Sequence, residues 1–169
     1  LAANIKPILG IEAYVAIGDR KERKQTGIRD GGFHLVLLAE NNIGWNNIVK
    51  LSSDSFLNGF YYRPRMDHST LEQYAEGIIA INGHLGSSIA YHLCRFVDTG
   101  EQSDWDNAIK EAKWHAKTFS PNEKGEPRFY IEVQKHDVQE QLAINPYLIK
   151  LARELDLPIV CDNDAHFLT

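Results

Sequence analysis

The stretch FHLVLLAENNIGWNNIVKL, residues 33–51, passes from a pattern typical of a strand directly into one typical of a helix. Its first seven residues are almost all apolar, as expected of a strand that is covered on both faces. The residues that follow space their apolar side chains at roughly helical intervals, at Ile43, Trp45, Ile48, Val49 and Leu51. A buried strand that leads at once into a helix is the repeating unit of α/β folds.

The same alternation extends outward along the chain. Further strands are expected at residues 6–17, 78–83, 128–134 and 157–163, and further helices at 67–77, 87–98, 103–120 and 137–156. The last helix is expected to break or restart near Pro146, because proline lacks the N–H that a helix interior requires. This order predicts an α/β fold with a mostly parallel sheet, either open or part of a barrel, with its chemistry at the C-terminal ends of the strands.

The composition is that of an ordinary globular domain. The 169 residues are 43% apolar and 24% charged, which suits one domain that spans residues 1–169. No run of about 18 apolar residues and no signal-peptide pattern is present, so we expect no association with a membrane. The two cysteines have no zinc-like spacing. Cys94 and Cys161 are expected to be reduced thiols in the cytoplasm, with Cys161 packed in a buried strand.

The net charge of −5 argues against a surface that holds duplex DNA by its phosphates, since such surfaces are normally basic. The one basic stretch is DRKERKQTGIR, from Asp19 to Arg29, and a solvated loop is its simpler interpretation. Action on nucleic acid would therefore require a local basic patch, a metal ion or a neighbouring domain.

Residues with metal-binding side chains follow or interrupt several of the expected strands. Asp164 and His166, in the terminal CDNDAHFLT, are two residues apart and would face the same side of an extended segment. Glu12 interrupts an apolar strand, where an unpaired carboxylate would be costly. His34 lies near the start of the second strand and His84 at the end of the third. Carboxylates and imidazoles suit zinc, manganese or iron, but each residue taken alone is more often a satisfied core or rim side chain.

Six blocks occur in order along nearly the whole chain: IKPILGIEAYVA, GGFHLVLLAENNIGWNNIVKL, GFYYRPRMD, EGIIAINGHLG, FYIEVQKHDVQEQ and LARELDLPIVCDNDAHFL. Together they resemble the PHP (polymerase and histidinol phosphatase) domain at the N-terminus of the bacterial DNA polymerase III alpha subunit. The resemblance implies a distorted (β/α)7 barrel, similar to a TIM barrel. It also implies divalent metal ions, zinc or manganese and up to three in a complete domain, at the C-terminal mouth of that barrel.

By this resemblance, the ligands of the family fall on five residues. The Glu of the GxEAYV block falls on Glu12, and the His of the HLxLLA block falls on His34. The cysteine of the family's SGC block is replaced here by His84, and the NDxH pair falls on Asp164 and His166. Because histidine is itself a good ligand, the replacement at His84 favours metal binding.

The sequence departs from the family at its beginning. The family carries an H-x-H block and a TDH block ahead of the IKPI strand, whereas this sequence begins LAANIKPI. We therefore expect a PHP fragment with an incomplete barrel, and little activity from these residues alone. In GFYYRPRMD, Arg63 and Arg65 are expected either to meet phosphate at the mouth of the barrel or to form structural ion pairs.

The function implied by the resemblance is DNA replication, as part of a DNA-directed DNA polymerase, which is a nucleotidyltransferase. Nothing in the sequence resembles a polymerase palm, so the chain itself is expected to offer a metal-dependent phosphoesterase site, a candidate 3′–5′ exonuclease. One alternative is a non-catalytic scaffold that supports the polymerase and docks a proofreading subunit. Another is a free-standing PHP phosphatase. The implied partners are DNA, reached through the parent polymerase, and other replisome subunits.

Overall fold

Six strands and five helices are formed by residues 4–24, 26–28 and 31–165, the part of the chain that the computed structural model describes. They belong to two compact units, unit 1 (Leu1–Ala80) and unit 2 (Ile81–Thr169), and strand β4 (Ile78–Asn82) passes from the first into the second. Strands and helices follow one another in both units, so the predicted mixed α/β class is confirmed.

Unit 1 is built on a small mixed sheet. Strand β1 (Gly10–Val15) pairs antiparallel with β2 (Phe33–Ala39) and parallel with β3 (Arg65–Met66). The prediction of a mostly parallel sheet is therefore wrong for β1 and β2. The described residues between these two strands form no helix, and an antiparallel return needs none, whereas a parallel crossover usually contains one.

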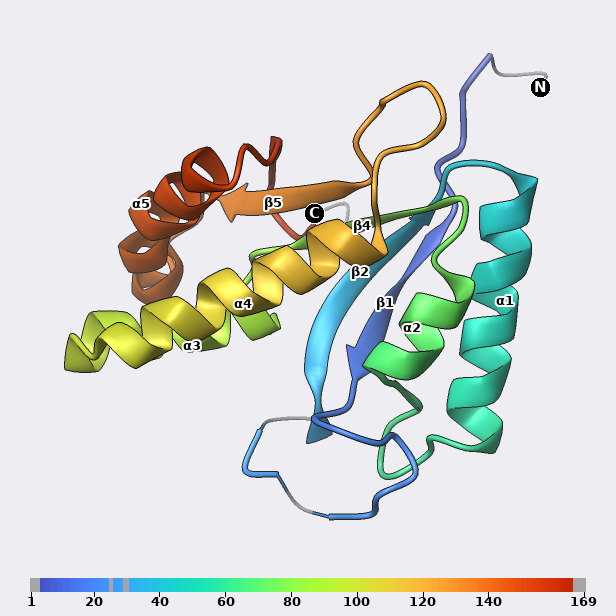
Figure 1. The fold of residues 1–169 in the computed structure, drawn as a ribbon, viewed down its shortest axis with the longest axis horizontal. Helices are drawn as coiled ribbons and strands as arrows, with labels where there is room; N and C mark the ends of the chain where they lie inside the picture. Colours follow the sequence, from blue (N-terminus) through green and yellow to red (C-terminus); the bar gives the residue numbers. More distant parts are fainter. Residues whose placement is uncertain (1–3, 25, 29–30, 166–169) are drawn as a thin grey trace. The chain divides into compact units, whose positions relative to one another are not determined.

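Two helices pack together beside this sheet, α1 (Asn42–Leu57) and α2 (His68–Tyr74), as Figure 1 shows. The core takes alternate residues from the strands and one stripe from each helix: Ala13, Val15, Leu35, Leu37, Ile48, Leu51 and Leu71. Such alternation is typical of a sheet with one fully covered face. The intervening Val36 and Leu38 are half-buried, so the predicted burial of β2 on both faces is only partly met.

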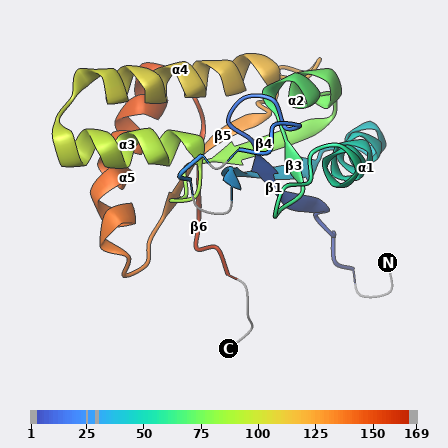
Figure 2. The same ribbon diagram turned by 90° about the horizontal axis from the view of Figure 1, so that it is seen from below.

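Unit 2 packs three helices against strands. Helices α3 (Ser88–Thr99) and α4 (Gln102–Thr118) run alongside each other, and α5 (Gln139–Glu154) packs against α3 and against strand β5 (Phe129–Gln134) (Figure 2). Strand β5 pairs in parallel with β6 (Ile159–Asp162), and the end of β4 is its other neighbour. Parallel pairing was the prediction for this part of the chain, and it is confirmed for β5 and β6.

Two details of unit 2 differ from the predictions. Helix α5 runs through Pro146 without a break, because the buried side chains of Ile144, Leu148 and Leu151 hold both halves of the helix in one core. Strand β6 is not buried: Ile159 and Cys161 are exposed, since β5 is its only neighbour among the described strands. The cysteines Cys94 and Cys161 are free, as predicted.

A membrane crossing needs a helix that is both long and apolar, and none of the helices in the described part of the chain meets that requirement.

Candidate metal centre

Glu12 and His34 form a pair on the less buried face of the sheet in unit 1. The register of β1 and β2 sets Tyr14 opposite His34 and Glu12 opposite Val36, so Glu12 and His34 are diagonal neighbours on one face. Glu12 Oε1 lies 2.6 Å from His34 Nδ1. The Glu12 side chain is 40% exposed and the His34 side chain 22% exposed. A carboxylate and an imidazole, both accessible and held together by the strand register, are two ligands of the types that zinc and manganese take.

The geometry of this pair corrects the reasons for which it was predicted. The two residues were expected to meet at neighbouring ends of parallel strands, but they meet across an antiparallel ladder. Glu12 was expected to be a buried carboxylate, but its side chain alternates with those of the buried residues Ala13 and Val15 and faces outward. The sequence signal that could have shown this is the alternation of β1 itself, whose apolar core positions are Ala13 and Val15.

Arg63 is linked to this pair by Tyr14, whose ring contacts both the Arg63 guanidinium and the His34 ring. The Tyr14 ring meets the His34 ring edge-on, with centroids 4.8 Å apart, and the Arg63 guanidinium lies 5.7 Å from the centroid of Tyr14. Arg63 is exposed, so an anion can approach it from solvent.

Arg65 has a different environment, since its side chain is only 2% exposed. It donates hydrogen bonds to the backbone carbonyls of Arg20 and Glu22, each at 2.8 Å, and of Gly59 at 3.2 Å. A side chain at Gly59 would collide with the Arg65 carbonyl, because a Cβ there would lie 2.0 Å from that oxygen. These contacts give Arg65 a structural role, but through backbone carbonyls and not through the ion pairs that were expected as the structural alternative.

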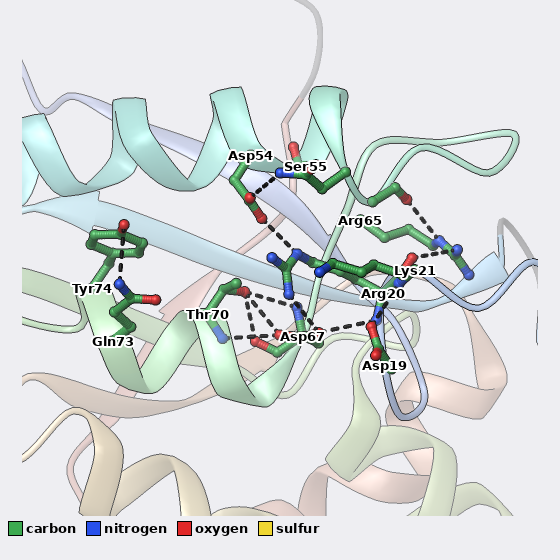
Figure 3. Close-up of polar contacts among 12 residues, drawn as sticks. Asp19, Arg20, Lys21, Asp54, Ser55, Arg65, Asp67, Thr70, Gln73 and Tyr74 are labelled. Atoms are coloured by element: carbon green, nitrogen blue, oxygen red, sulfur yellow. Dashed lines mark hydrogen bonds and ion pairs between the residues drawn. The ribbon is translucent and has the colours of Figure 1, made fainter.

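Arg65 belongs to a larger polar group, which we term the arginine cluster: Arg20, Asp54, Arg65 and Asp67 (Figure 3). Arg20 Nε lies 2.6 Å from Asp54, and Arg20 Nη1 lies 3.1 Å from Asp67. Burial alone would raise the pKa of Asp67, but hydrogen bonds from Arg20 and from the backbone of Thr70 outweigh it and lower that pKa. Burial would likewise raise the pKa of Asp54, but the hydrogen bond from Arg20 opposes it, and the pKa of Asp54 is lowered.

In unit 2, the loop after β4 carries His84, which is 9% exposed. The preceding Gly83 lies against the backbone of Glu132, where a Cβ would approach the Glu132 carbonyl oxygen to 2.2 Å. Only glycine therefore allows this approach of the two backbones. The Gly86 N–H donates to Nδ1 of His84 at 3.2 Å and holds the imidazole within the loop.

Beside this loop lies a second polar group, which we term the acidic cluster: Glu132, Gln134 and Asp162. Gln134 Nε2 donates to Glu132 Oε1 at 2.5 Å and to Asp162 Oδ1 at 3.2 Å. Glu132 is 2% exposed, and its Oε2 atom accepts no hydrogen bond from the described residues. Burial, then a hydrogen bond with Asp162 and the charges of Asp162 and Asp164, raise the pKa of Glu132 to about 8.

Glu132 was not among the predicted site residues, although the sequence carried a signal for it. It is an acid inside an otherwise apolar strand, FYIEVQ, so the burial argument made for Glu12 applies to Glu132. Glu132, in unit 2, is therefore a buried carboxylate without a full set of donors.

Asp164 follows β6 and is exposed, with a left-handed φ of 51° that aspartate tolerates better than most residues. Its charge contributes to the raised pKa of Glu132, which places Asp164 near the acidic cluster. His166, the other member of the predicted pair, lies outside the described residues. The structure thus brings Glu12 together with His34 in unit 1, and Asp164 close to the acidic cluster in unit 2.

The donors present fit a divalent cation. Glu132 is buried beside Asp162, and the charges of Asp162 and Asp164 help to raise its pKa to about 8. A cation is the ordinary means by which proteins compensate such a group of acids. By contrast, His115 is a satisfied core residue: its Nδ1 lies 2.8 Å from the Glu111 carbonyl oxygen and its ring stacks on Phe129.

Comparison with known proteins identifies a family and a group of relatives. The family model for the PHP domain matches residues 1–136. The DNA polymerase III subunit alpha of Borreliella burgdorferi is 38% identical over 166 residues, which cover 98% of this chain and 13% of the relative. The corresponding subunits of Thermus aquaticus and Campylobacter jejuni are 38% and 34% identical over 168 and 169 residues, or 99% and 98% of this chain. The chain therefore spans about 13% of the length of the curated relatives that it matches.

Proposed function

Because the chain belongs to the PHP domain family, we propose that it is the PHP domain of a DNA polymerase III alpha subunit and serves DNA replication. The support is identity of 34–38% to such subunits across nearly the whole chain. In this proposal the parent protein is the DNA-directed DNA polymerase, a cytoplasmic nucleotidyltransferase whose partners are DNA and other replisome subunits. The strands described here belong to the distorted (β/α)7 barrel of that family, and residues 1–169 form one functional domain.

The activity proposed for the domain itself is metal-dependent hydrolysis of a phosphodiester at the 3′ end of a DNA strand. The observation that carries it is the Glu12–His34 pair, two accessible ligand atoms that the register of β1 and β2 holds 2.6 Å apart. In the proposed site, His84, Asp164 and His166 complete the set of ligands for zinc or manganese. When bound, such ions would polarise the phosphodiester and stabilise charge on the leaving oxygen.

The residues of the chain have separate tasks in this proposal. Glu12 and His34 fix each other's orientation through their 2.6 Å contact, and both would hold the ion as ligands. Arg63 would contact a phosphate of the strand, because it is exposed and lies over the ring that touches His34. Arg65 has a structural task and is left out of the phosphate site.

The test uses the full-length protein, purified with and without zinc or manganese. It should contain divalent metal by elemental analysis and shorten a DNA strand labelled at its 5′ end. His84→Ala should lower the metal content and the rate together, whereas His84→Cys should keep much of both because thiolate also binds zinc. The matched control is His68→Ala at the start of α2, which should change neither value. The 169-residue chain alone should show little turnover.

The scaffold alternative makes the opposite forecast. A full-length protein that is free of metal, and inert with every divalent ion tried, would refute the proposed hydrolysis. The domain would then support the polymerase and its partners without chemistry of its own.

A further inference from the structure

Two stretches of the sequence have no part in the proposed metal centre: the basic loop that begins at Asp19, and the segment FLNGFYYRPR at residues 56–65, apart from Arg63. The structure brings them together in unit 1. Arg65 donates to the carbonyls of Arg20 and Glu22 in the loop, and to the carbonyl of Gly59 in the segment. A single buried guanidinium therefore fixes the basic loop against the aromatic segment (Figure 3).

A groove of about 440 Å³ lies where the two stretches meet, within the size range of ligand-binding clefts. Its walls combine aromatic rings with one guanidinium. The lining side chains include Arg23, Phe56, Leu57, Phe60, Tyr61 and Tyr62.

The apolar side chains of this groove are unusually exposed. Phe56, Leu57, Phe60 and Tyr62 are 59%, 81%, 49% and 73% exposed. One exposed apolar side chain is ordinary, but a contiguous group of them marks an interaction site. The rings of Phe56 and Phe60 are nearly parallel, at 27°, with centroids 6.3 Å apart. Tyr62 has a φ of 61°, which is uncommon for a bulky residue, so the fold holds this exposed ring in a sparsely populated backbone conformation.

The edge of the groove is basic although the chain as a whole has a net charge of −5. Residues 19–24, DRKERK, carry four basic and two acidic side chains. Arg20 is paired with Asp54 and Asp67, whereas Lys21 and Arg23 are exposed to solvent. Lys24 lies 3.3 Å from Glu22, so the positive charge offered to a polyanion comes from Lys21 and Arg23, of which Arg23 lines the groove.

We propose that this groove binds single-stranded nucleic acid, with bases stacked on Phe56, Phe60 and Tyr62 and with phosphates near Lys21 and Arg23. Exposed rings beside cations are the combination with which proteins hold single strands irrespective of sequence. A duplex does not offer the faces of its bases, and an acidic peptide would use the cations but leave the rings uncovered. The site does not depend on metal binding and is not part of the proposed hydrolysis.

The experiment measures the anisotropy of a labelled oligothymidylate, about 15 nucleotides long, as the 169-residue chain is added. Binding should weaken steeply as salt rises, because phosphate contacts release counterions. Phe60→Ala and Arg23→Glu should each weaken binding about tenfold, and Phe60→Trp should restore it because tryptophan also stacks. Comparing the affinity of the oligothymidylate with that of an oligouridylate of the same length shows whether the groove discriminates between DNA and RNA.

Matched controls are available in unit 2. Tyr91→Ala removes an exposed ring and Lys124→Glu reverses an exposed charge, and neither should alter the affinity. Adding a chelator should also leave the affinity unchanged, so a failure of the metal proposal can be told from a failure of this one. The inference is overturned if the oligonucleotide does not bind at low salt, or if the controls weaken binding as much as the groove variants do. It is equally overturned if light scattering shows a dimer that Phe60→Ala dissolves while no oligonucleotide binds.

Discussion

Units 1 and 2 each hold a cluster of polar side chains with at least one buried charged member, but the two clusters differ in their balance of charge. In the arginine cluster, Arg20 makes ion pairs with Asp54 and Asp67, and Arg65 donates three hydrogen bonds to backbone carbonyls. In the acidic cluster, Glu132 and Asp162 share one amide donor, that of Gln134. The electrostatic result is opposite, since the pKa values of Asp54 and Asp67 are lowered whereas that of Glu132 is raised to about 8.

This difference in charge balance separates polar groups that stabilise the fold from polar groups that are suited to bind a ligand. A buried network whose donors and acceptors are all satisfied specifies one local structure and leaves nothing for a ligand to do. Buried acids without a cation are costly unless they take up a proton or a metal ion. The arginine cluster therefore holds the loop between β1 and β2, and the acidic cluster fits a site that gains from a bound cation.

The largest expected effect comes from opening the arginine cluster. Arg65→Met should destabilise the protein by about 3 kcal/mol, because one buried and two partly buried hydrogen bonds to backbone carbonyls are lost at once. Urea unfolding measures this loss. The control is Arg63→Met, a change of the same residue type two positions earlier, where the side chain is exposed. Arg63→Met should cost less than about 0.5 kcal/mol, and equal losses for the two variants would contradict the structural assignment of Arg65.

The next effect comes from removing the unbalanced charge of the acidic cluster. The pKa of Glu132 rises from an ordinary value of 4.5 to about 8, so the folded protein holds a proton that the unfolded chain has released between these pH values. Stability without metal should therefore fall as the pH rises from 4.5 to 8. Glu132→Gln should remove this slope and stabilise the protein at pH 8 by an amount on the order of 2 kcal/mol.

Unfolding in urea with a chelator present, at several pH values, tests the slope. Glu123→Gln, an exposed acid of the same type, is the control and should leave it unchanged. A wild-type protein whose stability is level between pH 5 and pH 8 would show that Glu132 ionises normally.

Asp67 should give a smaller effect with the opposite dependence on pH. Its pKa is lowered, so its contribution is complete above the ordinary value of 3.8 and disappears as the pH falls through the folded value. Asp67→Asn keeps a residue that caps α2 well but loses the charge that pairs with Arg20. The variant should be less stable by about 1.5 kcal/mol at pH 7 and should equal the wild type in acid. Asp98→Asn, on the exposed side of α3, should show no such convergence.

The sequence predicts the order of the helices and of five strands well, because each of these strands contains a short apolar run and each helix has an apolar stripe. The two-residue strand β3, Arg65–Met66, was not predicted, since it has no apolar run. The sequence does not predict whether two strands pair parallel or antiparallel. The apolar run FHLVLLA is compatible with either direction of β2 relative to β1. The available signal was the connection between the two strands, whose described residues form no α-helix. The predicted break of the last helix at Pro146 was wrong, because burial of Ile144 and Leu148 in the core outweighs one missing hydrogen bond.

The candidate site was predicted only in part, because the sequence shows residue types but not strand register or burial. Glu12 and His34 were chosen correctly as a pair, but their contact depends on a register that no single strand encodes. Glu132 was missed because its burial and its neighbour Asp162 are tertiary facts, although an acid within FYIEVQ is an anomaly visible in the sequence. Residue type indicates a ligand, and only packing shows which acids lack a counter-charge.

The smallest expected effect on stability comes from changing Glu12, which is one of the two residues that carry the proposed function. Glu12→Gln should change the stability of the metal-free protein by less than about 0.5 kcal/mol, because the side chain is 40% exposed and its pair with His34 lies at the surface. Added zinc or manganese should stabilise the wild type by about 2.7 kcal/mol at a hundredfold excess over the dissociation constant, and Glu12→Gln should lose this gain. Thermal unfolding with and without metal measures both values, with Glu72→Gln on α2 as the control. A large loss without metal would make the pair a structural one like the arginine cluster, and an intact metal response would remove Glu12 from the ligands.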